Sequence, residues 1–308
     1  MVARRKKGQD IHGFVNFYKP KGMSSNAAVG YVRRLFDAKK AGHGGTLDPL
    51  AEGVLPIALG EATKTLSYML AEDKHYQFEM TFGAERDTDD AEGEVVQVSD
   101  NRPSQEELLD VMANFQGEIS QMPPVYSALK VNGKRACDRA RAGETVELAP
   151  RDVTIFNIEL ESFDTDKATL NVHVSKGTYV RSLCRDIGRA LGCFAFVSVL
   201  VRTKVPPFLI SQAVTQEKLD LCTKMGQSAQ TYLLDVDYVL DDIPVYTISK
   251  DEAQTVLNGQ ALELKGDHGL STGQMVRLKT KCGLLVSLAM LDNAVAKPQK
   301  NFPLLFEK

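Results

Sequence analysis

The sequence has no tryptophan, only five cysteines among 308 residues, and no long apolar run. The cysteines are odd in number and widely spaced, with no CxxC pair and no nearby histidine pair, so neither a disulfide framework nor a zinc site is expected. The longest apolar run, Phe194 to Val201, is far shorter than the roughly 18 residues that a membrane-spanning helix needs. No signal-peptide core follows the basic start. These absences favour a soluble, cytoplasmic protein that makes no membrane contact.

The sequence also carries little net charge, −3 at pH 7. Taken alone, this value argues against nucleic-acid binding, but the charges are segregated along the chain. Residues 1–43 hold ten basic and two acidic side chains, and residues 168–204 hold six basic side chains and one acidic side chain. Residues 84–110, in contrast, hold two basic and ten acidic side chains. Such segregation can form a basic face that neutralises phosphates while the whole chain stays soluble. Ordinary solvated helix faces would explain the same counts.

The remaining composition is ordinary globular material, 43% hydrophobic and 25% charged, in which helix and strand signals alternate with turn residues. This alternation predicts a mixed fold with much antiparallel sheet. Strands are expected at residues 13–18, 76–82 and 170–174, and the acidic loop 83–93 leads into a valine-rich segment at 95–98 as in a hairpin. Helices are expected after a serine cap at Ser24 or Ser25, over residues 104–117, and from Tyr179 onward.

The pattern changes near Ile243, where we expect a domain boundary. Ser249 and Glu252 are spaced as a capping box for a helix that ends near Gly259. Three short strands are expected after it, around residues 261–264, 275–279 and 284–291. The sequence thus divides into a large domain at 1–243 and a small β-rich domain at 244–308.

The densest candidate for chemistry is the glycine-rich segment from Ala41 to Pro56. Its glycines at 42, 44 and 45 let the backbone approach a ligand closely, and Pro49 biases Asp48 away from the helical region. The apolar neighbours of Asp48 would hydrate its carboxylate poorly, which favours a reactive nucleophile. The alternative is that Asp48 merely caps a helix that starts at Pro49.

The second candidate is the segment from Ser175 to Arg185, a strand end, a glycine turn and a helix start that together favour anion binding. Tyr179 and Arg181 are available there, and an arginine beside an aspartate would favour its ionised form. A basic surface helix is the alternative. Tyr76 offers a face for stacking on an extruded base, or else belongs to the core. His43, beside the glycines, is a candidate nucleotide contact.

The block Gly42-His-Gly-Gly-Thr-Leu-Asp-Pro-Leu-Ala51 closely resembles the catalytic loop of the TruB family of pseudouridine synthases. Four further blocks that resemble the same family occur in the right order: Lys19-Pro-Lys-Gly-Met-Ser-Ser25, Gly60-Glu-Ala-Thr-Lys64, Pro123-Pro-Val-Tyr-Ser-Ala-Leu-Lys130 and Gly177-Thr-Tyr-Val-Arg181. The likeness is strongest from residue 13 to 204 and weakest beyond 243. The chain departs from the family pattern at Gly44 (usually threonine), Cys137 (commonly aromatic), Val201 (usually arginine) and Pro206 (usually glycine).

The resemblance implies an α+β fold: a catalytic domain around a mixed, largely antiparallel sheet at 1–243, and a PUA-like RNA-binding domain at 244–308. The implied reaction isomerises uridine 55 in the T-loop of tRNA to pseudouridine, with the base flipped out of its stack. Its implied site residues are Asp48 as nucleophile, Tyr76 stacking on the base, Tyr179 as hydrogen-bonding group and proton acceptor, Arg181 paired with Asp48, His43 receiving the nucleotide, Leu200 binding the uracil edge through its backbone, and Lys19, Lys64 and Lys130 as phosphate or structural contacts.

The resemblance implies no metal and no organic cofactor, because the reaction needs neither redox chemistry nor water activation. It leaves open whether Asp48 attacks the base or the ribose. We expect a monomer that binds the T-arm of tRNA without a protein partner. Two other functions are considered, a tRNA-folding chaperone without catalysis and a guide-RNA-dependent synthase. The C-terminal lysines predict that truncation near Asp242 weakens tRNA binding more than chemistry, unless residues 244–308 cover the catalytic core.

Overall fold

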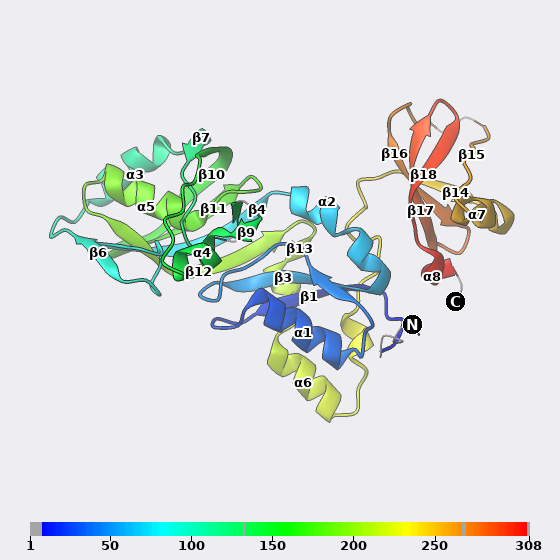
Figure 1. Cartoon of the computed structure of the whole chain (residues 1–308), viewed down its shortest axis with the longest axis horizontal. Helices are drawn as coiled ribbons and strands as arrows, with labels where there is room; N and C mark the ends of the chain where they lie inside the picture. Colours follow the sequence, from blue (N-terminus) through cyan, green and yellow to red (C-terminus); the bar gives the residue numbers. More distant parts are fainter. Residues whose placement is uncertain (1–7, 128, 132, 267–268, 307–308) are drawn as a thin grey trace.

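The computed structural model describes residues 8–127, 129–131, 133–266 and 269–306 (Figure 1). The side chains of Lys130 and Cys137 lie outside the described part. The largest sheet of the described chain has nine strands, and within it only the β12–β3 pair is parallel. The strands of that sheet, in spatial order, are β1 (Gly13–Lys19), β3 (Glu52–Leu59), β12 (Ala195–Val205), β4 (Lys74–Phe82), β11 (Lys167–Val174), β10 (Arg151–Asp164) and β7 (Gly117–Gln121), with β2 (Ala41–His43) paired to β3 and β13 (Phe208–Leu209) to β12. The expected mixed, largely antiparallel sheet is confirmed.

Helices cover this sheet where the sequence carries an apolar stripe. The helix α5 (Val180–Ala190) buries Val180, Leu183, Cys184 and Ile187, which recur at helical spacing, against β12 and β4. Ser24 caps α1 (Ser25–Leu35) through its side chain, as expected. The other helices of the large domain are α2 (Leu66–Ala71), α3 (Gln105–Ala113), α4 (Ala136–Arg141), α6 (Gln216–Lys224) and the 3₁₀ turns η1 (Gly60–Lys64), η2 (Ile210–Gln212) and η3 (Ala229–Tyr232). No described helix is both long and apolar enough to cross a membrane.

Two local expectations are wrong. The helix α3 has the capping box of Ser104 and Glu107 but ends at Ala113, and Gly117 starts β7 with φ of 98° instead of ending the helix. The valine segment does not pair with β4. It forms β6 (Val95–Val98), which pairs with β5 (Ala84–Arg86) as a separate two-stranded ribbon, and its residues are exposed. A second small ribbon joins β8 (Lys130–Val131) to β9 (Lys134–Arg135).

The C-terminal part is β-rich, with a five-stranded sheet, one capped helix and a short final helix. Its capping box of Ser249 and Glu252 is confirmed. The structure has five strands here where three were expected. The sequence did not predict β14 and β18, because neither shows a clear alternation of apolar and polar residues. The elements are β14 (Val245–Ile248), α7 (Lys250–Leu257), β15 (Leu262–Glu263), β16 (Met275–Thr280), β17 (Leu285–Asp292), β18 (Val295–Asn301) and α8 (Pro303–Phe306).

This part lies apart from the large sheet in Figure 1 but shares a hydrophobic cluster with the chain before it. Leu288 and Phe302, both 0% exposed, belong to the same cluster as Val236 and Leu240. Polar contacts join the two parts as well: the Lys300 ammonium donates to Lys64 O and Ser67 Oγ at 3.0 Å each. Residues 244–308 therefore cover part of the large domain's core.

We expect a chain truncated after Asp242 to lose folding stability before any separate loss of RNA affinity. Each large apolar side chain left uncovered costs about 2 kcal/mol, so exposure of this cluster lowers the free energy of unfolding by a few kcal/mol. Thermal unfolding of the truncated and full chains measures this loss. A truncated chain that unfolds at the same temperature as the full chain would show that the two parts are independent.

Candidate active site

A cleft of about 250 Å³ brings together five of the residues singled out in the sequence. Asp48 comes from the loop between β2 and β3, Tyr76 from β4, and Leu200 from β12, while Tyr179 and Arg181 lie at the start of α5. The sheet register places these elements together, because Tyr76 lies between Val172 of β11 and Arg202 of β12. Residues from Gly45 to Arg202, far apart in the chain, thus line one cleft.

The Asp48 loop is irregular, and no helix follows Pro49, since the next element is β3 from Glu52. The helix-cap alternative is therefore wrong. The expected poor hydration of Asp48 is also wrong for this structure, because its side chain is 39% exposed. Leu47 and Leu50, each 4% exposed, pack into the core and leave the carboxylate open to the cleft.

Buried cations hold this loop from beneath. Arg202, 1% exposed, donates from Nε to Val54 O at 2.8 Å and from Nη2 to Gly45 O at 3.1 Å. No pattern in the sequence distinguished Arg202 from its basic neighbours, because its role depends on the pairing of β12 with β3. The loop is also tied to α1, where Ser25 Oγ donates to Leu47 O at 2.9 Å.

Lys19 is fully buried and supports the same loop. Its ammonium donates to the carbonyls of Pro20 (3.0 Å), Met23 (2.8 Å) and Pro49 (3.5 Å). Burial lowers the pKa of Lys19 to about 8, although the charge of Asp48 acts in the opposite direction. These contacts favour the structural alternative for Lys19 over a phosphate contact, since 0% of the residue is exposed.

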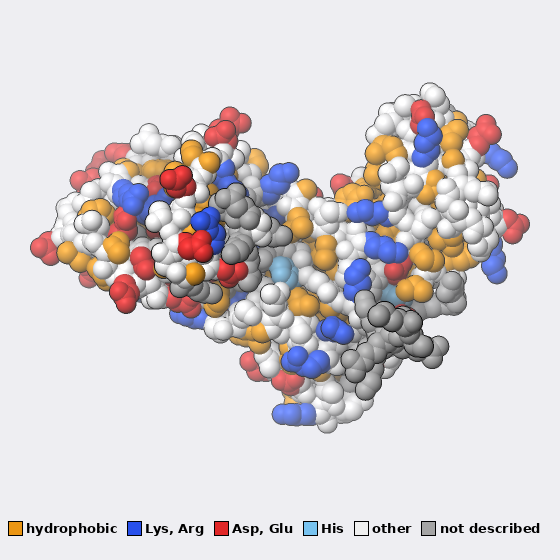
Figure 2. All heavy atoms as spheres, in the orientation of Figure 1, with side chains coloured by type: hydrophobic (Ala, Val, Ile, Leu, Met, Phe, Trp, Pro, Cys, Tyr) orange, Lys and Arg blue, Asp and Glu red, His pale blue; other side chains and the backbone are white. Residues whose placement is uncertain are grey.

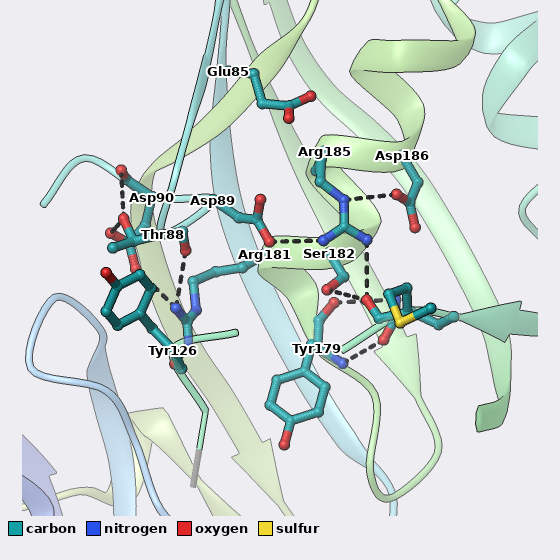
Figure 3. A network of polar contacts seen from close by, with 12 residues as sticks. Glu85, Thr88, Asp89, Asp90, Tyr126, Tyr179, Arg181, Ser182, Arg185 and Asp186 are labelled. Carbon is teal, nitrogen blue, oxygen red and sulfur yellow. Dashed lines mark hydrogen bonds and ion pairs between the residues drawn. The ribbon is translucent and has the colours of Figure 1, made fainter. Parts of the chain in front are cut away.

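Arg181 is the centre of a polar network drawn in Figure 3. Its Nη2 lies 2.8 Å from Asp48 Oδ2 and donates to Tyr126 O at 3.0 Å. Its Nη1 donates to Thr88 O at 3.0 Å and lies 3.3 Å from Asp90 Oδ2. The guanidinium is thus held by two carboxylates and two carbonyls while only 5% of the side chain is exposed. The sequence indicated the arginine but not Asp90, which lies in the acidic segment interpreted there as a loop.

Tyr179 and Tyr76 both line the cleft and are partly buried. Tyr179 caps α5 with its backbone, which is fixed by two hydrogen bonds with the Gln121 side chain, and the Arg151 guanidinium lies 5.7 Å from its ring centroid. Tyr76 packs against the main core and borders the cleft. Leu200, 6% exposed, pairs with Phe78 within the sheet.

His43 lies at the end of β2 and borders an adjacent hollow of about 280 Å³, not the main cleft. Asp48 and Arg181 line both hollows, so His43 faces the far side of the Asp48 loop. Burial lowers the pKa of His43, as does the charge of Arg202. Its Nδ1 is buried and finds no hydrogen-bond partner in the described residues.

Lys64 does not line the cleft. Its ammonium contacts Glu61 Oε2 and donates to Asn301 O, both at 2.7 Å, and lies 5.5 Å from the centroid of the Phe302 ring. These contacts join η1 to the C-terminal part, so Lys64 acts as a structural link in this structure.

The structure shows the surroundings of three departures from the family pattern, at Gly44, Val201 and Pro206. A Cβ at Gly44 would lie 2.6 Å from Met69 Cε, so the methionine fills the space that a threonine side chain would need. Val201 pairs with Glu52 across the parallel β12–β3 junction. Pro206 lies in the turn between β12 and β13 and, like Val201, does not line the cleft.

Apart from the cleft, the described chain gathers Asp73, His75 and His173, whose potential ligand atoms lie within 4.8 Å of one another. His75 and His173 face each other across β4 and β11, with ring centroids 4.0 Å apart and planes 9° apart. A metal lies close to the plane of each imidazole that binds it, and two stacked, parallel planes share no such position. His173 pairs with Asp73 instead. The two histidines thus form a stacked pair, with Asp73 bound to one of them. The sequence did not predict this grouping, because the two histidines become neighbours only when β4 pairs with β11.

Comparison with known proteins gives consistent results. Residues 33–180 match the family described as TruB family pseudouridylate synthase (N terminal domain), and residues 181–241 match the tRNA pseudouridylate synthase B C-terminal domain. The tRNA pseudouridine synthase B of Zymomonas mobilis is 50% identical over 259 residues, 82% of this chain and 84% of that protein. The Brucella ovis protein of the same name is 42% identical over 322 residues, which cover 98% of this chain and 99% of that protein. A chain in the crystal structure of a Cbf5-Nop10-Gar1 complex superposes with a TM-score of 0.70 at 26% identity, covering 94% of this chain and 84% of that chain.

Proposed function

Because the chain belongs to the TruB family of pseudouridine synthases, we propose that it isomerises uridine 55 in the T-loop of tRNA to pseudouridine, with Asp48 as the nucleophile. The names of its relatives support tRNA as the substrate. The observation that carries the mechanism is the contact between Arg181 and Asp48 at 2.8 Å, inside a cleft bordered by two tyrosines.

In this proposal the base leaves its stack and enters the cleft beside Asp48. The carboxylate, which lies 2.8 Å from Arg181 Nη2, attacks the uridine, and either the uracil ring or the ribose carbon is compatible with this residue set. The bond from N1 to C1′ breaks, the base turns, a bond from C5 to C1′ forms, and the bond between Asp48 and the uridine breaks, which restores the free carboxylate. The proton on C5 must leave and N1 must gain one, so the reaction is balanced without an oxidant or a cofactor.

The two tyrosines have distinct roles in the proposal. Tyr76 stacks on the base and holds it during its rotation, since a ring face tolerates rotation within its plane. Tyr179 presents a phenol to the base as a hydrogen-bonding group and accepts the C5 proton. The Leu200 backbone binds the uracil edge, and His43 receives the flipped nucleotide from the adjacent hollow.

We assign residues 1–243 to catalysis and residues 244–308 to a PUA-like domain that assists RNA binding, in a chain that acts as a monomer. Figure 2 supports a phosphate-binding surface: lysine and arginine side chains follow the concave region between the two parts, while acidic side chains gather over the lobe that contains α3 and β6. Cationic side chains along such a surface release counterions when they bind phosphates.

Incubating the purified chain with an unmodified tRNA transcript and mapping pseudouridine tests the function. Conversion confined to position 55 supports it. Binding and refolding of the transcript without conversion would favour the chaperone, and conversion only when a guide RNA is added would favour the guide-dependent synthase.

The absence of a metal step gives a separate prediction. We expect EDTA to leave turnover of prefolded tRNA unchanged, within about twofold, because every bond change above is assigned to side chains. Turnover is measured with and without chelator while tRNA folding is followed independently. A loss of turnover that zinc restores, with tRNA folding unaltered, would contradict this assignment.

A further inference from the structure

Arg181 has a counterpart one helical turn further along α5, at Arg185, and Figure 3 shows both side chains in contact with the segment from Thr88 to Asp90. Two like charges at this spacing repel each other unless acids separate them. Two consecutive aspartates supply the opposite charges: Asp90 contacts Arg181, and Asp89 lies 2.9 Å from Nη1 of Arg185. The side chains of Asp89 and Arg185 are each 8% exposed, so this second pair is shielded from solvent.

Arg185 binds both chain segments that hold Arg181. Through Asp89 it holds the segment of Thr88, whose carbonyl accepts from Arg181. Its Nη2 donates to Met122 O at 3.0 Å, at the start of the segment that ends at Tyr126, whose carbonyl also accepts from Arg181. Among the described residues, the other side-chain partner of Arg185 is its own neighbour Asp186, whose Oδ1 lies 2.9 Å from Arg185 Nε.

Asp89 needs such a partner for two reasons. Its φ of 60° lies in the left-handed region, which costs a non-glycine residue about 1 kcal/mol or more and persists only where contacts enforce it. Burial raises the pKa of Asp89 to about 6, while the charges of Arg185 and Arg181 act against that rise. The backbone at Asp89 also accepts from Val197 N at 3.1 Å, which docks the segment on the start of β12.

We propose, on the basis of the function proposed above, that Asp89 and Arg185 form a positioning pair for catalysis. The pair touches neither substrate nor reacting atoms. It fixes the Thr88–Asp90 segment and the Met122–Tyr126 segment, and these hold the Arg181 guanidinium against Asp48.

The test compares Asp89→Asn and Arg185→Lys with a matched control, Arg189→Gln. Arg189 lies one more turn along α5 and pairs with Glu85 at 2.7 Å, but it contacts neither segment that holds Arg181. Since misplacing a catalytic group by about 1 Å costs up to a hundredfold in rate, we expect the first two variants to lose tenfold to a hundredfold in single-turnover rate. Their tRNA affinity should stay within about twofold, and the control should keep both quantities.

A double-mutant cycle separates positioning from general stability. If the pair acts through Arg181, adding Asp89→Asn to Arg181→Lys lowers the single-turnover rate by less than about threefold. If the two residues act independently, the rate losses of the two single variants multiply in the double variant. Multiplying effects, or full activity in both single variants, would overturn the proposal. A crystal structure of Asp89→Asn gives a readout independent of turnover: Arg181 should move away from Asp48, and an unchanged contact refutes the proposal. If the wild-type chain itself fails to convert tRNA, the proposed function fails while this structural readout still decides the positioning role.

Discussion

Asp48→Asn is expected to abolish pseudouridine formation while leaving tRNA binding largely intact. The amide keeps the size and polarity of the carboxylate and can still accept from Arg181, which lies 2.8 Å away. It lacks the negative charge that makes the carboxylate a nucleophile toward the uridine. Removing a covalent nucleophile costs at least about 10⁴-fold in turnover.

Release of tritium from C5-labelled uridine measures this loss, because the C5 proton leaves during the reaction. Asp37→Asn is the matched control: it makes the same chemical change at an exposed residue, and asparagine tolerates the φ of 46° found there. Substantial activity of Asp48→Asn, beside a fully active control, would eliminate Asp48 as the nucleophile and leave the ion pair with Arg181 as a structural feature.

Tyr76 is expected to show the second largest effect, and the effect should depend on the ring. Tyr76→Phe keeps the aromatic face and should retain most of the activity. Tyr76→Leu removes it, and because stacking a base on an aromatic ring contributes roughly 1–3 kcal/mol, the rate should fall about a hundredfold.

The ring of Tyr76 also packs against the main core, so thermal unfolding must accompany the rate measurements. A leucine variant that folds as stably as the wild type but reacts slowly supports stacking. Equal rates for the two variants would show that this tyrosine serves only the core, the alternative that its place in an alternating strand had left open.

The sequence by itself determined several local elements and named five residues of the cleft. The cap at Ser24, the capping boxes at Ser104 and Ser249, and the apolar stripe of α5 could be predicted because each depends on residues within one or two turns. Asp48, Tyr179 and Arg181 could be named because they fall in ordered motifs, and Tyr76 and Leu200 because the resemblance covers most of the chain. Their catalytic roles remain predictions.

The resemblance implied the pair of Arg181 and Asp48, but only the tertiary structure decided which other charges meet. Strand register places Arg202 beneath the Asp48 loop, and the docking of residues 87–91 on β12 places Asp90 beside Arg181. The tertiary structure also buries Lys19, which the sequence analysis had proposed as a phosphate or structural contact. A charge is buried only where distant backbone carbonyls or opposite charges compensate its lost hydration, and those partners come from other strands and loops. Spacing along the chain carries no information about such partners, because they become neighbours only when the sheet has formed.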